Sequence, residues 1–438
     1  MKMIAILIVT QFALGTSTSA RASELTTRPN ILFIVCDDLN THVTTSGYAH
    51  IKTPAFDQLS AAGMTFRRAY CQYPVCGPSR ASFLSGLYPE STGILDNKSD
   101  IRQTRPGTVS MPHCFKQAGY WTAAVGKVFH NMKTDPGKVA WDQVLRFDND
   151  QMPLVTQAIE AFEKQHGSVK KGKNRRRWKE HLAALSTQTR GQEQPGYGPS
   201  GLRDQQHKDG KNVRQIASWL DNKAYGDKPF FIVGGIQKPH VPFLAPDAYF
   251  ALYPKDDLSF RLTPMGFWNQ APRLAMVRRY KSFGFDLGVE NDPLRREYTQ
   301  AYHACISFID AQIGLLFDAL KRNGLWDNTI IVLTSDHGYQ LGEHFMWGKV
   351  TLFEECARVP MIVRVPGHSQ AGSQTEGLVE LIDVFPTLID LCDVDSPHTL
   401  QGKSFASMLN APGSSGKEVA YTVVTRGALL GHSIRTAH

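Results

Sequence analysis

Residues 30–38 read Asn30-Ile31-Leu32-Phe33-Ile34-Val35-Cys36-Asp37-Asp38. After Asn30 the run is continuously apolar, which is typical of a strand buried on both faces in the middle of a parallel sheet. Two acids follow directly at its carboxyl end, where open α/β sheets build their sites. In isolation such acids also fit a helix cap or a solvated turn. The stretch predicts a central strand with a candidate site at its carboxyl end.

Similar apolar runs recur and alternate with helix-like patterns. The predicted strands are Pro229–Ile236, Thr329–Thr334 and Pro360–Val365, with a strand-like segment at Trp121–Gly126, and the longest predicted helix is Leu294–Asn323. This alternation favours a doubly wound α/β sheet.

Two folded units are expected. The larger one, residues 23–375, contains all of these strands. From about residue 376 a smaller α+β unit follows, with a predicted helix at Leu378–Cys392 and a strand at Ala420–Thr425.

The first 22 residues have the pattern of an export signal. Lys2 is followed by the apolar run Ile4–Leu14 and by the A-x-A site Ala20-Arg21-Ala22, which together are typical of a cleaved secretory signal peptide. The apolar run is too short for a membrane anchor, and no later stretch is expected to span a membrane. The sequence therefore predicts a periplasmic or secreted protein.

The basic charge of the chain is local. The formal net charge is +8, and residues 164–179 contain eight lysines and arginines and no acid, so the rest of the chain sums to zero. A local run of this kind is usually a solvated insertion, here predicted at about 163–205, or it is a patch that attracts a polyanionic substrate. A basic domain and a DNA-binding motif are both missing from the sequence, so nucleic acid is not expected as a partner.

One cysteine stands out among seven. An odd number in an exported protein leaves at least one unpaired, and Cys76 opens the run Cys76-Gly77-Pro78-Ser79-Arg80. The Gly-Pro pair and the following pattern predict a helix start, where free N–H groups favour negative charge. The alternative is a loop cysteine in front of a surface helix.

Other residues that can take part in chemistry follow a predicted strand or lie in a predicted loop, so one edge of the sheet could gather them all. The aspartates among them are hard oxygen ligands of the kind that Ca²⁺ prefers. The five groups are Asp37 with Asp38, Cys76 to Arg80, Lys127 with His130, Lys238 with His240, and Asp336 with His337 and Lys349.

These motifs together carry a family resemblance. C-G-P-S-R-A-S-F-L-S-G at 76–86 resembles the signature of the type I, formylglycine-dependent sulfatases. With G-K-V-F-H at 126–130, K-P-H-V-P-F at 238–243, T-S-D-H-G at 334–338 and L-G-E-H and W-G-K shortly after, the chain is similar to the iduronate-2-sulfatase branch over about 28–430. The resemblance implies an alkaline-phosphatase-like fold with a large mixed, mostly parallel sheet flanked by helices.

The resemblance also implies a modified nucleophile and a metal ion. A maturation enzyme would read Cys76 to Arg80 and oxidise Cys76 to formylglycine, whose hydrate attacks the sulfur of a sulfated sugar. Ca²⁺ would be held by Asp37, Asp38, Asp336, His337 and the modified Cys76.

Five further residues would surround the reacting groups. Arg80 would hold the hydrate, because a guanidinium stays charged and donates a fork of hydrogen bonds. Lys127 would flank it, and His130 would remove its second hydroxyl proton to expel sulfate. Lys349 and His240 would contact the sulfate and the leaving oxygen, with His240 as the proton donor. Lys127, His130 and His240 also fit purely structural roles.

Alternatives from other classes remain open. A phosphatase or phosphonate hydrolase of the same superfamily would use the same kind of cationic site. A sulfated-glycan-binding protein without turnover is a third hypothesis, because the stretch Ser433–Thr436 normally continues into a strand and a helix in the family, whereas this sequence ends at His438. The C-terminal unit, 376–438, is therefore expected to be partial, with an unpaired sheet edge.

Overall fold

The computed structural model describes most of the chain. It covers residues 28–130, 139–185 and 196–437, except for 261–262, 265, 273, 276–280, 283–284, 287–292 and 369. The predicted signal peptide and residues 186–195 of the predicted insertion lie outside the described residues.

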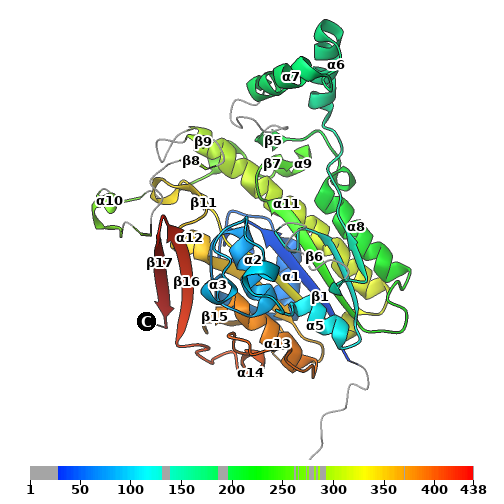
Figure 1. Cartoon of the computed structure of the whole chain (residues 1–438), viewed down its shortest axis with the longest axis vertical. Helices are drawn as coiled ribbons and strands as arrows, with labels where there is room; N and C mark the ends of the chain where they lie inside the picture. The colour runs from blue at the N-terminus through cyan, green and yellow to red at the C-terminus, as the bar shows by residue number, and fades with distance from the viewer. Residues whose placement is uncertain are drawn as a thin grey trace, which may run out of the picture.

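A nine-stranded sheet forms the centre of the molecule (Figure 1). Its strands run in the order β14-β2-β13-β10-β1-β6-β3-β4, and β15 also pairs with β2. Their bounds are β1 Asn30–Asp37, β2 Met64–Tyr70, β3 Trp121–Gly126, β4 Gln143–Leu145, β6 Phe230–Pro239, β10 Thr329–Ser335, β13 Arg358–Arg364, β14 Ser373–Thr375 and β15 Val379–Glu380.

The central position predicted for the first apolar run is confirmed. All eight residues of β1 are buried, and β1 pairs in parallel with β10 on one side and β6 on the other. The predicted fold class is confirmed as well: the sheet is mostly parallel and becomes mixed at β13, which is antiparallel to both β10 and β2.

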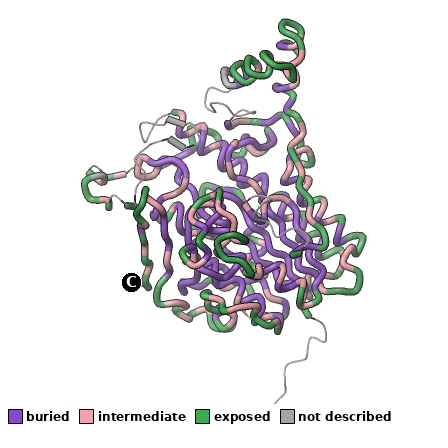
Figure 2. The backbone as a smooth tube through the Cα atoms, in the orientation of Figure 1, coloured by how far each residue is buried: buried purple, intermediate pink, exposed green. Residues whose placement is uncertain are grey.

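Both faces of the sheet are covered because successive side chains of a strand point to opposite faces. Leu32 and Ile34 pack among α1 (Pro54–Ala62), α8 (Lys208–Asp221) and α11 (Pro293–Arg322). The alternate residues of β1, Ile31, Phe33 and Val35, pack against the other face. The helices of that face are α2 Cys76–Ser85, α5 Met111–Gln117 and α13 Val384–Leu391. Figure 2 shows the resulting buried interior.

Helix α11 corrects one expectation. By length and composition this 30-residue helix could cross a membrane, although the sequence was expected to contain no such stretch after residue 22. However, 78% of its most apolar 18-residue stretch is buried inside the protein, and the helix packs on α8 and β7 (Phe243–Ala245). It is therefore a core helix of the protein, on the face of the sheet that α1 and α8 also cover.

The basic insertion contains regular structure that the sequence did not predict. It forms two helices, α6 (Pro153–His166) and α7 (Gly172–Leu185), which project from the rest of the molecule as a hairpin (Figure 1). A small apolar cluster connects them to the body: Val155 and Leu182 pack with Leu244 of β7.

The C-terminal region also differs from prediction. The helix expected at 378–392 begins only at Val384, because Val379–Glu380 forms β15 on the edge of β2 and a 3-10 turn follows. A separate two-stranded sheet consists of β16 (Val419–Arg426) and β17 (Leu429–Thr436). On β17, Leu429 and Ile434 are 62% and 63% exposed.

Shorter elements connect these units. The short helices are α3 Pro89–Thr92, α4 Ile101–Thr104, α9 Asp247–Phe250, α10 Phe267–Gln270, α12 Glu354–Ala357 and α14 Ala406–Asn410, and the 3-10 turns are η1 Thr44–Ser46, η3 Asp204–Gln206, η4 Lys255–Asp257, η5 Trp326–Asn328, η6 Glu343–Phe345 and η7 Leu381–Asp383. The short strands are β5 Tyr197–Pro199, β8 Lys281–Ser282, β9 Phe285–Asp286, β11 Gln340–Leu341 and β12 Trp347–Gly348.

Lys417 joins the segment before β16 to the main sheet through two buried acids. Its ammonium donates to Glu380 and lies 3.0 Å from Asp383 Oδ1, and the two acidic side chains are 0% and 1% exposed. We expect Lys417→Met to lower the free energy of unfolding by about 3–5 kcal/mol, because it leaves buried charge without a partner. Urea denaturation measures this loss.

Lys403 provides the matched control for Lys417. Its backbone N–H donates to the same Asp383 Oδ1 at 2.7 Å, but its side chain is exposed. Lys403→Met is expected to change the free energy of unfolding by less than about 0.5 kcal/mol. Equal losses in the two variants would contradict the role assigned to the Lys417 ammonium.

Asp310 of α11 caps the amino terminus of α1 from a distant part of the chain. Its carboxylate accepts hydrogen bonds from the backbone N–H groups of Ala55 and Phe56 at 3.1 and 2.9 Å, and burial nevertheless raises the pKa of Asp310 to about 7. The folded state therefore keeps this proton at pH values where the unfolded state, with a pKa of about 3.9, has lost it.

Because the folded state binds one more proton than the unfolded state in this range, the free energy of unfolding falls as the pH rises from about 4 to about 7. We expect Asp310→Asn, which cannot titrate, to remove that part of the pH dependence. Thermal unfolding of both proteins across this range measures it, and parallel pH profiles would contradict the prediction.

Candidate active site

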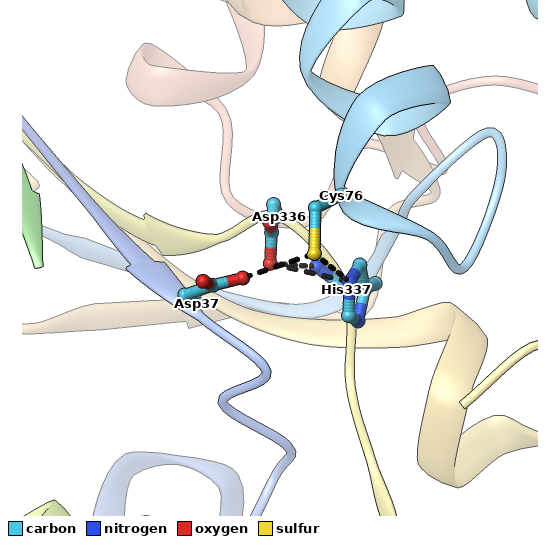
Figure 3. A group of neighbouring side chains, drawn as sticks. All are labelled: Asp37, Cys76, Asp336 and His337. Atoms are coloured by element: carbon cyan, nitrogen blue, oxygen red, sulfur yellow. Dashed lines mark hydrogen bonds and ion pairs between the residues drawn. The ribbon is translucent and has the colours of Figure 1, made fainter. Parts of the chain in front are cut away.

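The predicted site residues come together at the carboxyl edge of the sheet, and Figure 3 shows four of them: Asp37, Cys76, Asp336 and His337. Asp37 ends β1, Lys127 follows β3, His240 follows β6 and Asp336 follows β10, while Cys76 begins α2. Because β1, β3, β6 and β10 are parallel neighbours, their carboxyl ends lie at one edge and direct these side chains into one region.

Asp38 has an unusual backbone that turns the chain into the site. Its φ is 67°, a left-handed value that a residue with a side chain rarely adopts. Two contacts hold it: its N–H donates to Asp336 Oδ1 at 3.2 Å, and its carbonyl oxygen accepts from the Tyr302 hydroxyl at 2.6 Å. The strained residue therefore belongs to a pair of adjacent acids, Asp37 and Asp38, whose side chains are both fully buried.

The thiol of Cys76 lies between a negatively charged and a positively charged side chain. Its Sγ is 3.2 Å from Asp37 Oδ1, 3.1 Å from Lys349 Nζ and 3.4 Å from His337 Nε2, and the residue is 1% exposed. Burial, and next the charge of Asp37, raise the pKa of Cys76 to about 12. In this site the thiol is therefore protonated at neutral pH.

Arg80, one turn further along α2, ties the acids to the loop after β3. Its Nε donates to Asp336 Oδ2 at 2.8 Å, while its Nη1 donates to the carbonyl oxygens of Lys127 and, at 3.0 Å, Val128. Its Nη2 has no hydrogen-bond partner among the described residues and lies 3.8 Å from Asp37 Oδ1. A guanidinium so fixed has the two N–H groups of Nη2 left for a further anionic group.

Each buried carboxylate has its own cation. Lys127 Nζ lies 2.5 Å from Asp37 Oδ2, and Lys349 Nζ lies 2.6 Å from Asp38 Oδ1. Arg80 is the cation that pairs with Asp336. Burial alone would raise the pKa of Asp37, but Lys127 and then His240 and Arg80 hold it well below its usual range. Three negative and three positive side chains thus leave the site formally neutral.

His337 directs its Nε2 atom toward this group. Its Nδ1 lies 2.9 Å from the carbonyl oxygen of Gly338, which can only accept, so Nδ1 carries the proton. Its Nε2 then faces Asp38 Oδ1 and Asp336 Oδ1 at 3.4 and 3.7 Å. An imidazole ring whose second nitrogen is fixed by a carbonyl oxygen is the arrangement found at metal-binding histidines.

The donor set fits a divalent metal ion. One ligand atom from each of Asp37, Cys76, Asp336 and His337 lies within 4.8 Å of the others (Figure 3). Asp38 Oδ2 is buried and has no hydrogen-bond partner among the described residues, which leaves an acceptor available to a cation. Three carboxylates are hard oxygen ligands. Asp37, Asp38 and Cys76 form a second such group with His240.

The two other predicted histidines lie at the border of this group. His240 Nε2 is 4.0 Å from Asp38 Oδ2, and burial lowers its pKa although Asp38 and Asp37 oppose this. His130 Nδ1 is buried without a hydrogen-bond partner among the described residues. Burial, and then Lys127 and Arg80, lower the pKa of His130 to about 4, so its ring is neutral and can accept a proton.

Two other residues of the predicted motifs, Lys238 and His344, lie outside the reacting group, as does His303 of α11, which belongs to none of the motifs. Lys238 is 4% exposed, and its ammonium donates to the carbonyl oxygens of His240 and Pro242, so it shapes the loop. His303 is buried beside His42, with 3.1 Å between their ring nitrogens. His344 stacks on aromatic rings.

Sequence reasoning missed several supporting residues. Gly77 N–H donates to Asn97 Oδ1 at 2.8 Å, and a Cβ at Gly77 would approach that oxygen to 2.7 Å, so the contact requires glycine. The segment around Asn97 also lines a pocket beside Cys76 that reaches His130, with Arg102 and His113 on its wall. No pattern in the sequence connected these residues to the site.

Comparison with known proteins identifies the family. The family model described as "Sulfatase" matches residues 29–394. A sulfatase of Formosa agariphila is 30% identical, covering 91% of this chain and 76% of the relative, and the iduronate 2-sulfatase of Mus musculus is 30% identical, covering 91% and 75%.

A solved structure, the phosphonate monoester hydrolase of Agrobacterium radiobacter, has a TM-score of 0.70 at 21% identity, covering 91% of this chain and 80% of that one. This likeness supports the fold alone. The family match, by contrast, covers the residues of the site, among them Asp37, Cys76 and Asp336. The chain therefore belongs to the sulfatase family and is a hydrolase of that family.

Proposed function

We propose that this protein is an exported hydrolase that removes sulfate from a sulfated sugar, with a 2-O-sulfated uronic acid as the favoured unit. The observation that carries the proposal is the position of Cys76 Sγ, 3.2 Å from Asp37 Oδ1 and 3.1 Å from Lys349 Nζ. The group at position 76 thus lies between a carboxylate cluster suited to a cation and an ammonium suited to a sulfuryl oxygen. The iduronate 2-sulfatase relative supports the sugar unit.

Two groups that the chain must acquire belong to the proposal. Asp37, Asp38, Asp336 and His337, with the group at position 76, would hold Ca²⁺, and a maturation enzyme would convert Cys76 to formylglycine. Bound Ca²⁺ supplies positive charge beside position 76, and a hydrated aldehyde supplies a nucleophilic oxygen.

The remaining residues act on the ester and its proton transfers. The ammonium groups of Lys127 and Lys349 stabilise the charge that develops on the sulfuryl oxygens. Arg80 Nη2 donates to the group at position 76. His240 is our candidate proton donor to the leaving sugar oxygen. The neutral His130, with a free Nδ1 among the described residues, is our candidate base for the hydroxyl proton whose loss expels sulfate.

The test is sulfate release from a panel of sulfated mono- and disaccharides by protein co-expressed with a maturation enzyme. Mass spectrometry of the peptide that contains position 76 reports the conversion of the CH₂–SH group to an aldehyde. We expect both the mass change and release from a 2-O-sulfated uronic acid. Unmodified cysteine with no sulfate release would contradict the proposal, and glycan binding that survives without turnover would favour a binding protein.

Metal removal should affect both activity and stability. Without a cation, the buried carboxylates Asp37, Asp38 and Asp336 depend on side-chain cations alone. We expect EDTA to lower sulfate release about 100-fold or more and to lower the Tm, and added Ca²⁺ to restore both. Restoration by Zn²⁺ but not by Ca²⁺ would contradict the assignment of the ion.

Phosphate and phosphonate esters are the competing substrates, because a neutral site with three cations also suits a phosphoryl group. Side-by-side kcat/KM values for a sulfate and a phosphate ester of the same alcohol decide between them. We expect the sulfate ester to be preferred, since Cys76 stands where a phosphatase of this superfamily would use serine or threonine.

A further inference from the structure

The α6–α7 hairpin carries a concentrated excess of positive charge, with eight cations at 164–179 against the three acids Glu160, Glu163 and Glu180. Eight cations of residues 164–179 are exposed, with no acid among them. Arg176 pairs with Glu180 at 3.3 Å, both strongly exposed, and within the described part of the chain no other ion pair involves these eight. The cations are Lys164, Lys170, Lys171, Lys173, Arg175, Arg176, Arg177 and Lys179.

The hairpin leaves the body at the active-site edge of the sheet. Strand β4 is parallel to β3, with Leu145 opposite Val125, so β4 ends at the edge where Lys127 follows β3. The chain enters α6 at Pro153, a few residues later, and Figure 1 shows α6 and α7 projecting from the body. The hairpin is thus attached to the body near the edge of the sheet that carries the catalytic group.

A chain of contacts joins the base of the hairpin to the His240 loop. Asn149 Oδ1 accepts from the Lys208 backbone N–H at 2.8 Å, and Lys208 Nζ donates to Gln237 Oε1 at 2.8 Å. Gln237 carbonyl in turn accepts from the His240 backbone N–H at 2.9 Å. Leu244, just after this loop, packs in the apolar cluster under the hairpin.

The inner side of the hairpin is a groove of about 570 Å³. Its wall combines three cations, Lys170, Arg175 and Lys179, with the half-buried indole of Trp178 and the amide of Gln151. Cations suit sulfate groups, and an aromatic surface with amide groups suits the apolar face and hydroxyls of a sugar ring. Helix α7 alone is about 21 Å long, so it can contact several charges of one polymer.

We propose that the α6–α7 hairpin binds a sulfated polysaccharide and holds the chain whose sulfate esters the active site hydrolyses. The identity of the polymer rests on the proposed function, whereas the polyanion-binding surface rests on the hairpin alone. The groove binds the chain away from the reacting ester, and the exposed cations steer it to this edge. Duplex DNA and an anionic lipid surface share the negative charge but lack the alternation of sugar faces and sulfates.

The test compares the full chain with a fourfold variant, Lys170→Gln, Lys173→Gln, Arg175→Gln and Lys179→Gln. These side chains are exposed and Trp178 and the Arg176–Glu180 pair stay in place, so the Tm is expected to remain that of the parent protein. Heparin serves as the sulfated polymer. We expect its affinity to fall about tenfold or more in the variant, with a shallower dependence on salt.

A matched control removes the same charge elsewhere. The control carries Lys52→Gln, Lys223→Gln, Lys228→Gln and Lys403→Gln, four exposed lysines on other elements, and it is expected to bind heparin within about twofold of the parent. Equal loss in both variants would overturn the proposal, because net charge alone would then explain binding. DNA or anionic vesicles that bind as tightly as heparin at equal salt, with the same loss in the hairpin variant, would overturn it as well.

Turnover gives a second readout. The ratio of kcat/KM for a sulfated oligosaccharide to that for a monosaccharide sulfate is expected to fall in the hairpin variant and to stay constant in the control. A constant ratio in both would overturn the link to the active site. The heparin comparison needs no turnover, so a protein that releases no sulfate at all would contradict the proposed function and leave the binding test to decide on the hairpin.

Discussion

Cys76→Ala is expected to reduce sulfate release about 10⁴-fold or more while leaving the protein folded. The substitution removes the group that lies between Asp37 and Lys349 and from which the proposed nucleophile is formed, and losses of a covalent nucleophile are of this size. The lost contacts are those of one sulfur atom, so the Tm should change by only a few degrees. Initial rates on a sulfated disaccharide, corrected for folded protein, measure the effect.

Cys114 supplies the control for this prediction. It is also a buried cysteine, 3% exposed, but it lies on α5 and its thiol contacts the carbonyl oxygen of Asp395. Cys114→Ala is expected to keep the rate within about threefold of the parent protein. A similar loss in both variants would point to damaged packing, and an active Cys76→Ala protein would exclude Cys76 as the source of the nucleophile.

Lys349→Met is expected to lower both stability and activity, and Ca²⁺ should restore only the stability. The ammonium is 2.6 Å from Asp38 Oδ1, so its removal leaves a buried carboxylate without a cation, at about 3–5 kcal/mol. Added Ca²⁺ neutralises Asp38 and should return most of the lost Tm. Sulfate release should stay about 100-fold to 1,000-fold below the parent, because the charge on the sulfuryl oxygens is no longer stabilised.

Lys238→Met distinguishes this effect from the loss of any buried lysine. Lys238 is also buried, but its ammonium donates to two loop carbonyl oxygens rather than to a site carboxylate. The Tm of the Lys238→Met variant should fall, and the rise in its Tm on adding Ca²⁺ should be no larger than that of the parent protein. Thermal unfolding of the three proteins with EDTA and with Ca²⁺ gives the comparison, and recovery of activity in Lys349→Met on adding Ca²⁺ would contradict the role of the ammonium.

The central strands β1, β6 and β10 could be predicted because their sequences are largely apolar, whereas β2, with Arg67 and Arg68, could not. A run such as Ile31 to Cys36 is compatible with few other structures, and the acids after it had to lie at the carboxyl edge. Asp37, Lys127 and Asp336 could therefore be predicted to lie together because they follow strands, whereas Cys76 and Lys349 were added to them by the motifs of the family resemblance.

Features that depend on distant contacts could not be predicted. Helix α7 is polar almost all round, and the packing of Trp178 and Leu182 on α6 and the body contributes to its stability. The late start of α13 depends on the pairing of Val379 with Ala69 of β2. The strained turn at Asp38 depends on the Tyr302 hydroxyl, 264 residues away, and a core tyrosine on a helix gives no sign of such a role.

The burial of the first turn of α2 has a consequence for the timing of events in the cell. Cys76, Gly77, Pro78, Ser79 and Arg80 are all buried, and a second enzyme cannot surround a segment packed in this way. In the proposed function, conversion of the thiol therefore has to precede the docking of α2 on the sheet. Maturation and folding then compete, and the share of active molecules is set before α2 packs on the sheet and cannot be raised by treating the purified, folded protein.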